Sequence, residues 1–109
     1  MDIVSWLGRD LPDAYSAYLQ SNPNEQTYGD VLLYASDSLV ERNETYEVKQ
    51  YCPGFITIGD DGGGRAIMLS LSDSSIHVVG HGVMSAEWME PIADSFPSWL
   101  DQGCPLEDE

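Results

Sequence analysis

The sequence contains few basic residues. It has 4 lysines and arginines against 19 aspartates and glutamates in 109 residues, which gives a formal net charge of −15. This charge repels nucleic acids and anionic membrane surfaces, so we expect neither of them as a direct partner. Such acidity either serves solubility or steers a basic protein toward the chain, and composition leaves both interpretations open.

Long apolar runs are absent as well. No stretch approaches the roughly 18 consecutive apolar residues that cross a membrane, and residues 1–6 lack the basic region of a signal peptide. We therefore expect a cytoplasmic protein. The length fits one domain that covers residues 1–109, and a hydrophobic content of 42% is enough to form a core without disulfides.

Cysteine and histidine are too few to suggest a metal centre. Cys52 and Cys104 are far apart in the chain, and in a reducing compartment such a pair is expected to remain as free thiols. His77 and His81 would lie about 13 Å apart on an extended strand, too far to share one ion. The sequence predicts neither a metal site nor a cofactor.

Catalytic motifs are also missing. No serine lies in a nucleophile-elbow pattern. The glycine-rich run at residues 59–64 lacks the lysine of a phosphate loop, and its two aspartates, Asp60 and Asp61, would repel a phosphate. We interpret the run as a hairpin turn whose glycines adopt positive φ, and we expect a protein that is not an enzyme and has no catalytic residues.

The patterns in the first half of the chain predict helices around one strand. Apolar residues at positions 11, 15, 18 and 19 indicate a helix over residues 11–19, with Pro12 in its first turn. Residues 27–35 favour a single interior strand. A short helix is expected over residues 37–43, whereas residues 44–51 are ambiguous.

The second half of the chain is rich in β-forming residues. Strands are predicted at residues 55–58, 65–71 and 76–80, and the polar turns between them indicate an antiparallel meander. Ser95 or Asp94 then begins a C-terminal helix that contains Pro97. This order of elements is typical of an α+β fold rather than of alternating βαβ units.

Three tryptophans could contribute to a core or to a surface that binds a partner: Trp6, Trp88 and Trp99. Large aromatic side chains bury more apolar area than any other residue type, so we expect all three in the core or at its edge. Aromatic residues beside acidic ones also suit an interface, and this alternative stays open.

One group of acidic residues recurs at spacings of three and four: Asp37, Glu41, Glu44 and Glu47. If the segment is helical, these carboxylates form one negative stripe with little compensation from basic neighbours. The stripe is either an ordinary solvated face or the surface that meets a basic protein. These four residues are the candidate partner-binding residues.

Several strings, taken in order, make the chain resemble the SUKH superfamily, the Smi/Knr-type domain. They are LPDAY at residues 11–15, GDVLLY at residues 29–34, PGFITIGDDGGG at residues 53–64 and IADSFPSWL at residues 92–100. Two features depart from the family pattern. The helix that usually precedes the first string is nearly absent, and Asn22-Pro23-Asn24 replaces the usual Asn-Gly-Gly turn.

The resemblance implies a single-domain α+β fold in which a central, mostly antiparallel sheet is flanked by helices. It also implies a role, because bacterial members are typically immunity proteins that bind and neutralise toxins, often nucleases. A cognate toxin domain with a basic surface would suit the net charge of −15. The alternatives are a housekeeping adaptor of the same fold and a nucleic-acid mimic that inhibits another DNA-binding protein.

Overall fold

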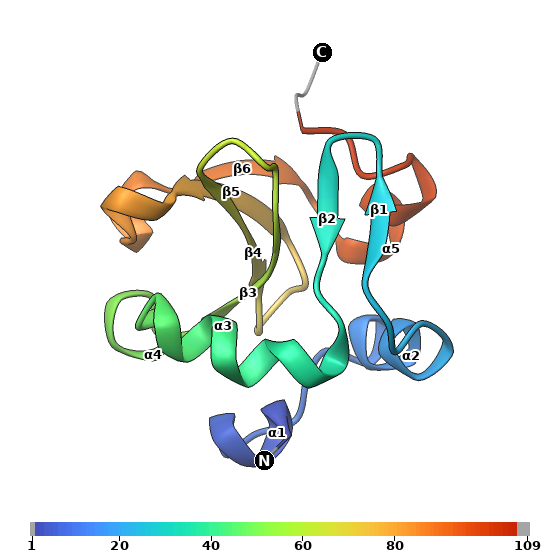
Figure 1. Ribbon diagram of the computed structural model, residues 1–109, viewed down its shortest axis with the longest axis horizontal. Helices are drawn as coiled ribbons and strands as arrows, with labels where there is room; N and C mark the ends of the chain where they lie inside the picture. Colours follow the sequence, from blue (N-terminus) through green and yellow to red (C-terminus); the bar gives the residue numbers. More distant parts are fainter. Residues whose placement is uncertain (1, 107–109) are drawn as a thin grey trace.

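The computed structural model describes residues 2–106 and confirms the α+β class (Figure 1). The strands are β1 (Gln26–Tyr28), β2 (Val31–Leu33), β3 (Phe55–Asp60), β4 (Arg65–Ser70), β5 (Ile76–Gly80) and β6 (Glu90–Ala93). They form one sheet in chain order, and each neighbouring pair is antiparallel. The predicted meander is therefore confirmed, and it continues beyond the three strands expected.

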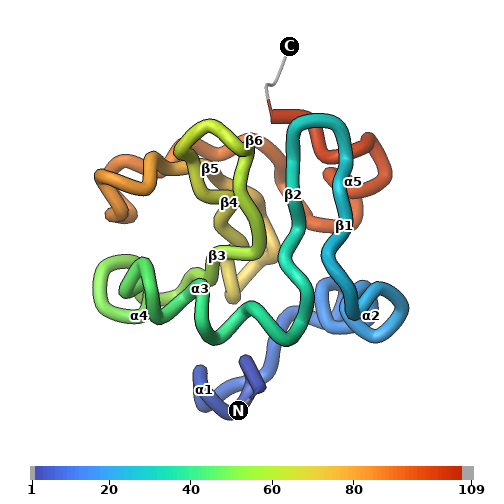
Figure 2. Tube along the Cα trace, viewed as in Figure 1, coloured from blue at the N-terminus to red at the C-terminus, as the bar shows by residue number. Residues whose placement is uncertain are grey.

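The helices and 3₁₀ turns surround this sheet. They are α1 (Ile3–Leu7), α2 (Asp13–Ser21), η1 (Ser36–Ser38), α3 (Leu39–Thr45), α4 (Val48–Tyr51), η2 (His81–Val83), η3 (Ala86–Trp88) and α5 (Phe96–Asp101). The path of the chain places α3 and α4 at one end of the strands and α2 beside α5 (Figure 2). No helix among residues 2–106 has the length and apolar character that crossing a membrane requires.

Each face of the sheet carries its own apolar core. Alternation along β4 points Ile67 and Leu69 to the larger core, which contains the buried residues of α1, α2 and α5. The intervening residues Ala66 and Met68 point to a smaller core on the other face, where they meet Val48 of α4. The sheet is covered on both faces, which explains why its central strands contain almost continuous apolar runs.

Local sequence explains where the helices begin. Ser95 precedes α5, and its side chain accepts a hydrogen bond from the Ser98 amide, as the predicted cap requires. Pro12 is the cap residue of α2 rather than a member of its first turn. Asp2 caps α1 by accepting from the Ser5 amide at 2.8 Å, so a short helix does precede the first family string.

The strand predicted over residues 27–35 is wrong in detail. The segment forms two short strands, β1 and β2, because the chain turns back at Gly29, which has a φ of 60°. β2 lies inside the sheet between β1 and β3, whereas β1 forms the edge. The sequence signal for extended structure was correct, but the turn within it was missed.

Strand β3 contains a bulge that fixes the position of α3. The register with β4 shifts between Thr57 and Gly59, so Ile58 is the extra residue. Asn43 of α3 completes the hydrogen bonding of the bulged strand: its side-chain oxygen accepts from the Thr57 amide at 2.8 Å, and its Nδ2 donates to the Thr57 carbonyl at 3.1 Å. The carbonyl of Ile58, the extra residue, accepts a hydrogen bond from the Tyr34 amide. Helix α3 is thus held directly against β3, along the part of that strand that does not pair with β2.

Candidate functional site

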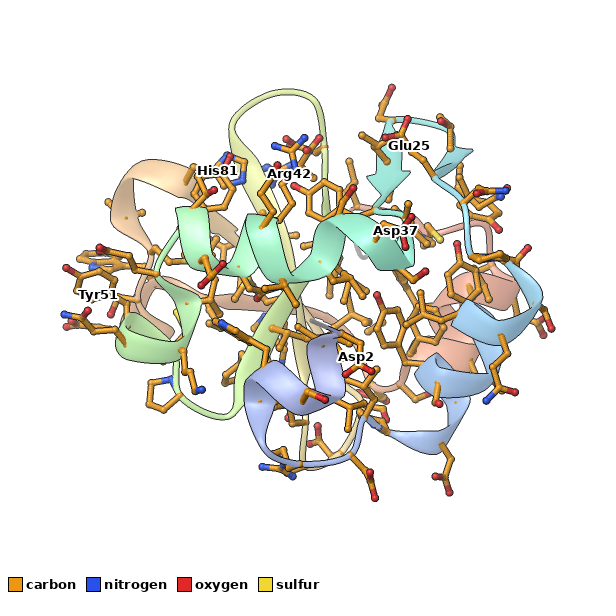
Figure 3. All side chains as sticks on the ribbon, turned by 60° about the horizontal axis from the view of Figure 1, so that its bottom comes forward. Asp2, Glu25, Asp37, Arg42, Tyr51 and His81 are labelled. Carbon is orange, nitrogen blue, oxygen red and sulfur yellow. The ribbon has the colours of Figure 1, made fainter. Side chains whose placement is uncertain are left out.

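The four predicted partner-binding residues lie along one continuous segment at the surface: Asp37 in η1, Glu41 and Glu44 in α3, and Glu47 just after it. All four side chains are exposed. The opposite side of α3 is buried through Leu39 and Asn43, so the carboxylates face away from the core. We call these four residues the acidic stripe, and Figure 3 shows Asp37 at the start of it.

Each of the four basic side chains contacts another part of the chain. Arg65 pairs with Asp61 at 2.7 Å, which is the one ion pair formed within residues 2–106. Lys49 donates to the Trp6 carbonyl at 2.7 Å. The remaining two are Arg42, whose guanidinium lies 5.1 Å from the centre of the Tyr34 ring, and Arg9, which donates to the Leu71 carbonyl. Within residues 2–106, none of the four carboxylates of the acidic stripe forms an ion pair.

A groove of about 490 Å³ opens at the end of the acidic stripe. One wall comes from the segment between α3 and α4, and the other comes from the η2–η3 segment, which faces α4 at one end of the molecule (Figure 1). Glu47, the last residue of the stripe, lines it together with Tyr51, Val83 and Trp88. The groove joins two segments, residues 45–51 and residues 81–88, that are at least thirty residues apart in the chain.

Trp88 is the clearest disagreement with the sequence analysis. Its side chain is 62% exposed, whereas Trp99 is fully buried and Trp6 is partly buried, as expected for core and core-edge positions. The segment around Trp88 has no helical or strand periodicity that would have placed it in advance. The signal that could have raised the question is the aromatic residue next to Glu87 in an otherwise irregular stretch.

Glu47 has a backbone conformation that is unusual for its residue type. Its φ of 53° and ψ of 40° lie in the left-handed region, which favours glycine. The conformation turns the chain between α3 and α4 and places Glu47 at the rim of the groove. Left-handed residues other than glycine concentrate at functional sites, because the surrounding structure must hold them there at a cost in stability.

We expect Glu47→Gly to raise the free energy of unfolding by about 0.5–1 kcal/mol, because it relieves this backbone strain. Urea unfolding at neutral pH measures the change. Ser74→Gly is the matched control, since Ser74 has a φ of 65° in the turn between β4 and β5, away from the groove. A lower free energy of unfolding for Glu47→Gly would mean that the backbone at Glu47 is not strained.

The glycine-rich turn is a hairpin loop, as its sequence suggested. Gly62 and Gly64 have positive φ. The amide of Gly63 donates to Asp61 at 2.8 Å, and the amide of Gly62 donates to Asp60 at 3.0 Å. Burial alone would raise the pKa of Asp61, but hydrogen bonds from Arg65 and the loop amides hold that pKa below its usual range. The loop amides already bind carboxylates of the chain, which leaves them unsuited to a phosphate.

The histidines and cysteines lie apart. His77 of β5 contacts Ser75 through Nε2 at 2.8 Å, and burial lowers its pKa. His81 is the first residue of η2 rather than part of β5, and its ring stacks on the ring of Tyr46. Cys52 and Cys104 are buried free thiols, and burial raises the pKa of Cys104 to about 11. Within residues 2–106, no three histidine, cysteine or carboxylate side chains come together as metal ligands would.

The antiparallel fold, the acidic stripe and the groove define a small acidic α+β protein. Residues 2–102 match the SMI1 / KNR4 family (SUKH-1), and the chain therefore belongs to this family. The resemblance seen in the sequence strings is confirmed. Comparison with curated proteins gave no match. Membership is consistent with a protein-binding role of the toxin-immunity type, and the family is generally one of binding proteins rather than enzymes.

Proposed function

We propose that this protein is a cytoplasmic, non-enzymatic immunity protein that binds and neutralises a cognate basic toxin domain. The contact surface includes the acidic stripe. The observation that carries the proposal is the arrangement of charge: exposed carboxylates follow α3, and none of them forms an ion pair within residues 2–106. Membership of the SUKH-1 family supports the same role.

The charge arrangement has a physical advantage for such a role. A toxin that acts on nucleic acid presents a basic surface to phosphate, and an acidic protein can cover that surface. Attraction between opposite charges speeds the encounter of the two proteins by about 10- to 1000-fold, and this steering falls steeply with ionic strength. An immunity protein gains from fast association, because the toxin must be captured before it reaches its substrate.

We expect the double variant Glu41→Lys/Glu44→Lys to bind a basic toxin encoded beside its gene at least about tenfold more slowly. The variant should also protect toxin-expressing cells less well. Stopped-flow mixing at several salt concentrations measures the association rate, which should fall for the unmodified protein as ionic strength rises to 0.15 M, where the Debye length is about 8 Å. The dissociation rate should change less.

Asp10→Lys/Asp101→Lys is the matched control, since both side chains are exposed and lie outside the acidic stripe. It changes the net charge by the same amount, so it should retain most of the association rate and full protection. If the association rate falls equally in both double variants, the attraction depends on the net charge of the protein and not on a defined surface. Full protection by the Glu41/Glu44 variant would place the contact surface elsewhere. Failure of the unmodified protein to protect against that toxin would contradict the immunity role and favour the adaptor alternative.

A further inference from the structure

The groove between α4 and the η2–η3 segment concentrates exposed apolar surface. Four large hydrophobic side chains are exposed among residues 2–106, and three of them line this groove: Tyr51 at 49%, Val83 at 51% and Trp88 at 62%. Single exposed apolar side chains are normal, but three in one hollow mark a place where something binds. In Figure 3, Tyr51 points outward at this end of the molecule.

The walls of the groove are packed against the smaller core. Tyr46 and His81 stack with their ring centres 4.3 Å apart and their planes within 4° of each other, which ties the helical wall to η2. Met84 lines the groove and also packs on the smaller core, beside Val48 and Cys52. The groove is thus held open by core contacts, which reduces the ordering that binding requires.

Charge around the groove selects the occupant. Among the described residues, the lining includes Glu47 and His81 but no lysine or arginine, and the acidic stripe leads up to the groove. Lys49, the nearest basic residue along α4, is directed to Trp6, whose ring centre lies 4.9 Å from its ammonium nitrogen. Exposed aromatic rings beside a carboxylate are what a guanidinium recognises, because it can stack on the ring and pair with the acid at once.

We propose that this groove is the anchoring pocket for an arginine side chain in a basic segment of the partner protein. The arginine stacks on Trp88 and pairs with Glu47, while the acidic stripe attracts the rest of the segment. This inference rests on the proposed function, since it assumes a basic protein partner. A second copy of the chain is disfavoured as the occupant, because it would bring another net charge of −15 to the same carboxylates.

Nuclear magnetic resonance titration with a short capped peptide, in which arginine alternates with glycine, tests the pocket without the toxin. We expect the indole N–H signal of Trp88 to shift, while that of Trp99, which donates to the Pro105 carbonyl at 2.8 Å, stays fixed. Trp88→Ala should weaken peptide binding about tenfold or more, as loss of an aromatic anchor does. Glu47→Gln should weaken it too, whereas Val4→Ala, which removes exposed apolar surface elsewhere, should not.

Three results would overturn the anchoring pocket. One is that the Trp88→Ala variant binds the arginine peptide as tightly as the unmodified protein does. Another is equally tight binding of a peptide with norleucine in place of arginine, which would mean an apolar rather than a cationic occupant. The third is concentration-dependent dimerisation in sedimentation experiments that disappears with Trp88→Ala, which would identify a second copy as the occupant.

The protection that Trp88→Ala gives to toxin-expressing cells separates this inference from the proposed function. If Trp88→Ala protects cells fully while Glu41→Lys/Glu44→Lys does not, the toxin binds the acidic stripe and the anchoring pocket is wrong. If the unmodified protein gives no protection at all, the immunity role fails, and the peptide titration still decides whether the groove takes arginine. Loss of protection in both variants supports the stripe and the pocket together.

Discussion

Replacement of Asn43 by alanine is expected to lower the free energy of unfolding by about 3 kcal/mol. Asn43 is fully buried, and its amide group pairs with both the N–H and the carbonyl of Thr57. Removal of the side chain leaves both backbone groups buried without a partner, at about 1–3 kcal/mol for each such group. Urea unfolding followed by circular dichroism measures the loss. The large effect arises because Asn43 substitutes for a neighbouring strand along this part of β3.

Two further variants test this explanation. Asn22→Ala is the matched control, because Asn22 donates only to the Tyr18 carbonyl at the end of α2, so we expect a loss below about 1 kcal/mol. Asn43→Asp keeps the acceptor for Thr57 but buries a carboxylate whose folded-state pKa must rise. Its deficit relative to the unmodified protein should therefore be smaller at pH 4 than at pH 7, since the protonated acid can donate. A loss below 1 kcal/mol for Asn43→Ala would contradict the bridging role.

The β-rich second half could be predicted because its signals are local. The continuous apolar run in β4 and the Asp/Gly loop before it each specify a strand or a turn without reference to distant residues. The C-terminal helix was predictable for the same reason, from Ser95 and Pro97 at its start. Among the elements that were missed, α1 and β6 span five and four residues, too few to develop a periodic pattern.

The candidate site likewise has one part that the sequence indicates, the acidic stripe, and one part that it does not, the groove. The acidic stripe runs over η1, α3 and the turn before α4 rather than along one helix, and all four of its carboxylates are exposed. Its role in binding stays a prediction. The groove could not be predicted, since it arises from contact between the α3–α4 turn and the η2–η3 segment. Nothing local to Trp88 shows that its ring is left uncovered, because this depends on the tertiary fold.

Gly59 is the position at which a single methyl group is expected to disturb the sheet most. A Cβ at this residue would collide with the Leu32 carbonyl oxygen and lie 3.1 Å from a methyl carbon of Leu33. Strand β2 pairs with β3 only at Leu32 and Leu33, opposite Asp60 and Gly59, so the colliding backbone cannot shift without loss of that pairing. The bulge beside Gly59 and the approach of β2 both depend on the absence of a side chain.

We therefore expect Gly59→Ala to lower the free energy of unfolding by at least about 2 kcal/mol, as overpacking against backbone does. Hydrogen exchange should also show faster exchange of the Tyr34 amide, which donates to the Ile58 carbonyl of β3, because β2 detaches from β3. Gly63→Ala is the matched control in the same hairpin: its Cβ would meet only Asp61 at 3.5 Å, and its φ is not positive, so stability should change by less than about 0.5 kcal/mol. Equal stability of the two variants would mean that β2 tolerates the added methyl group, and that the close approach at Gly59 does not constrain the sheet.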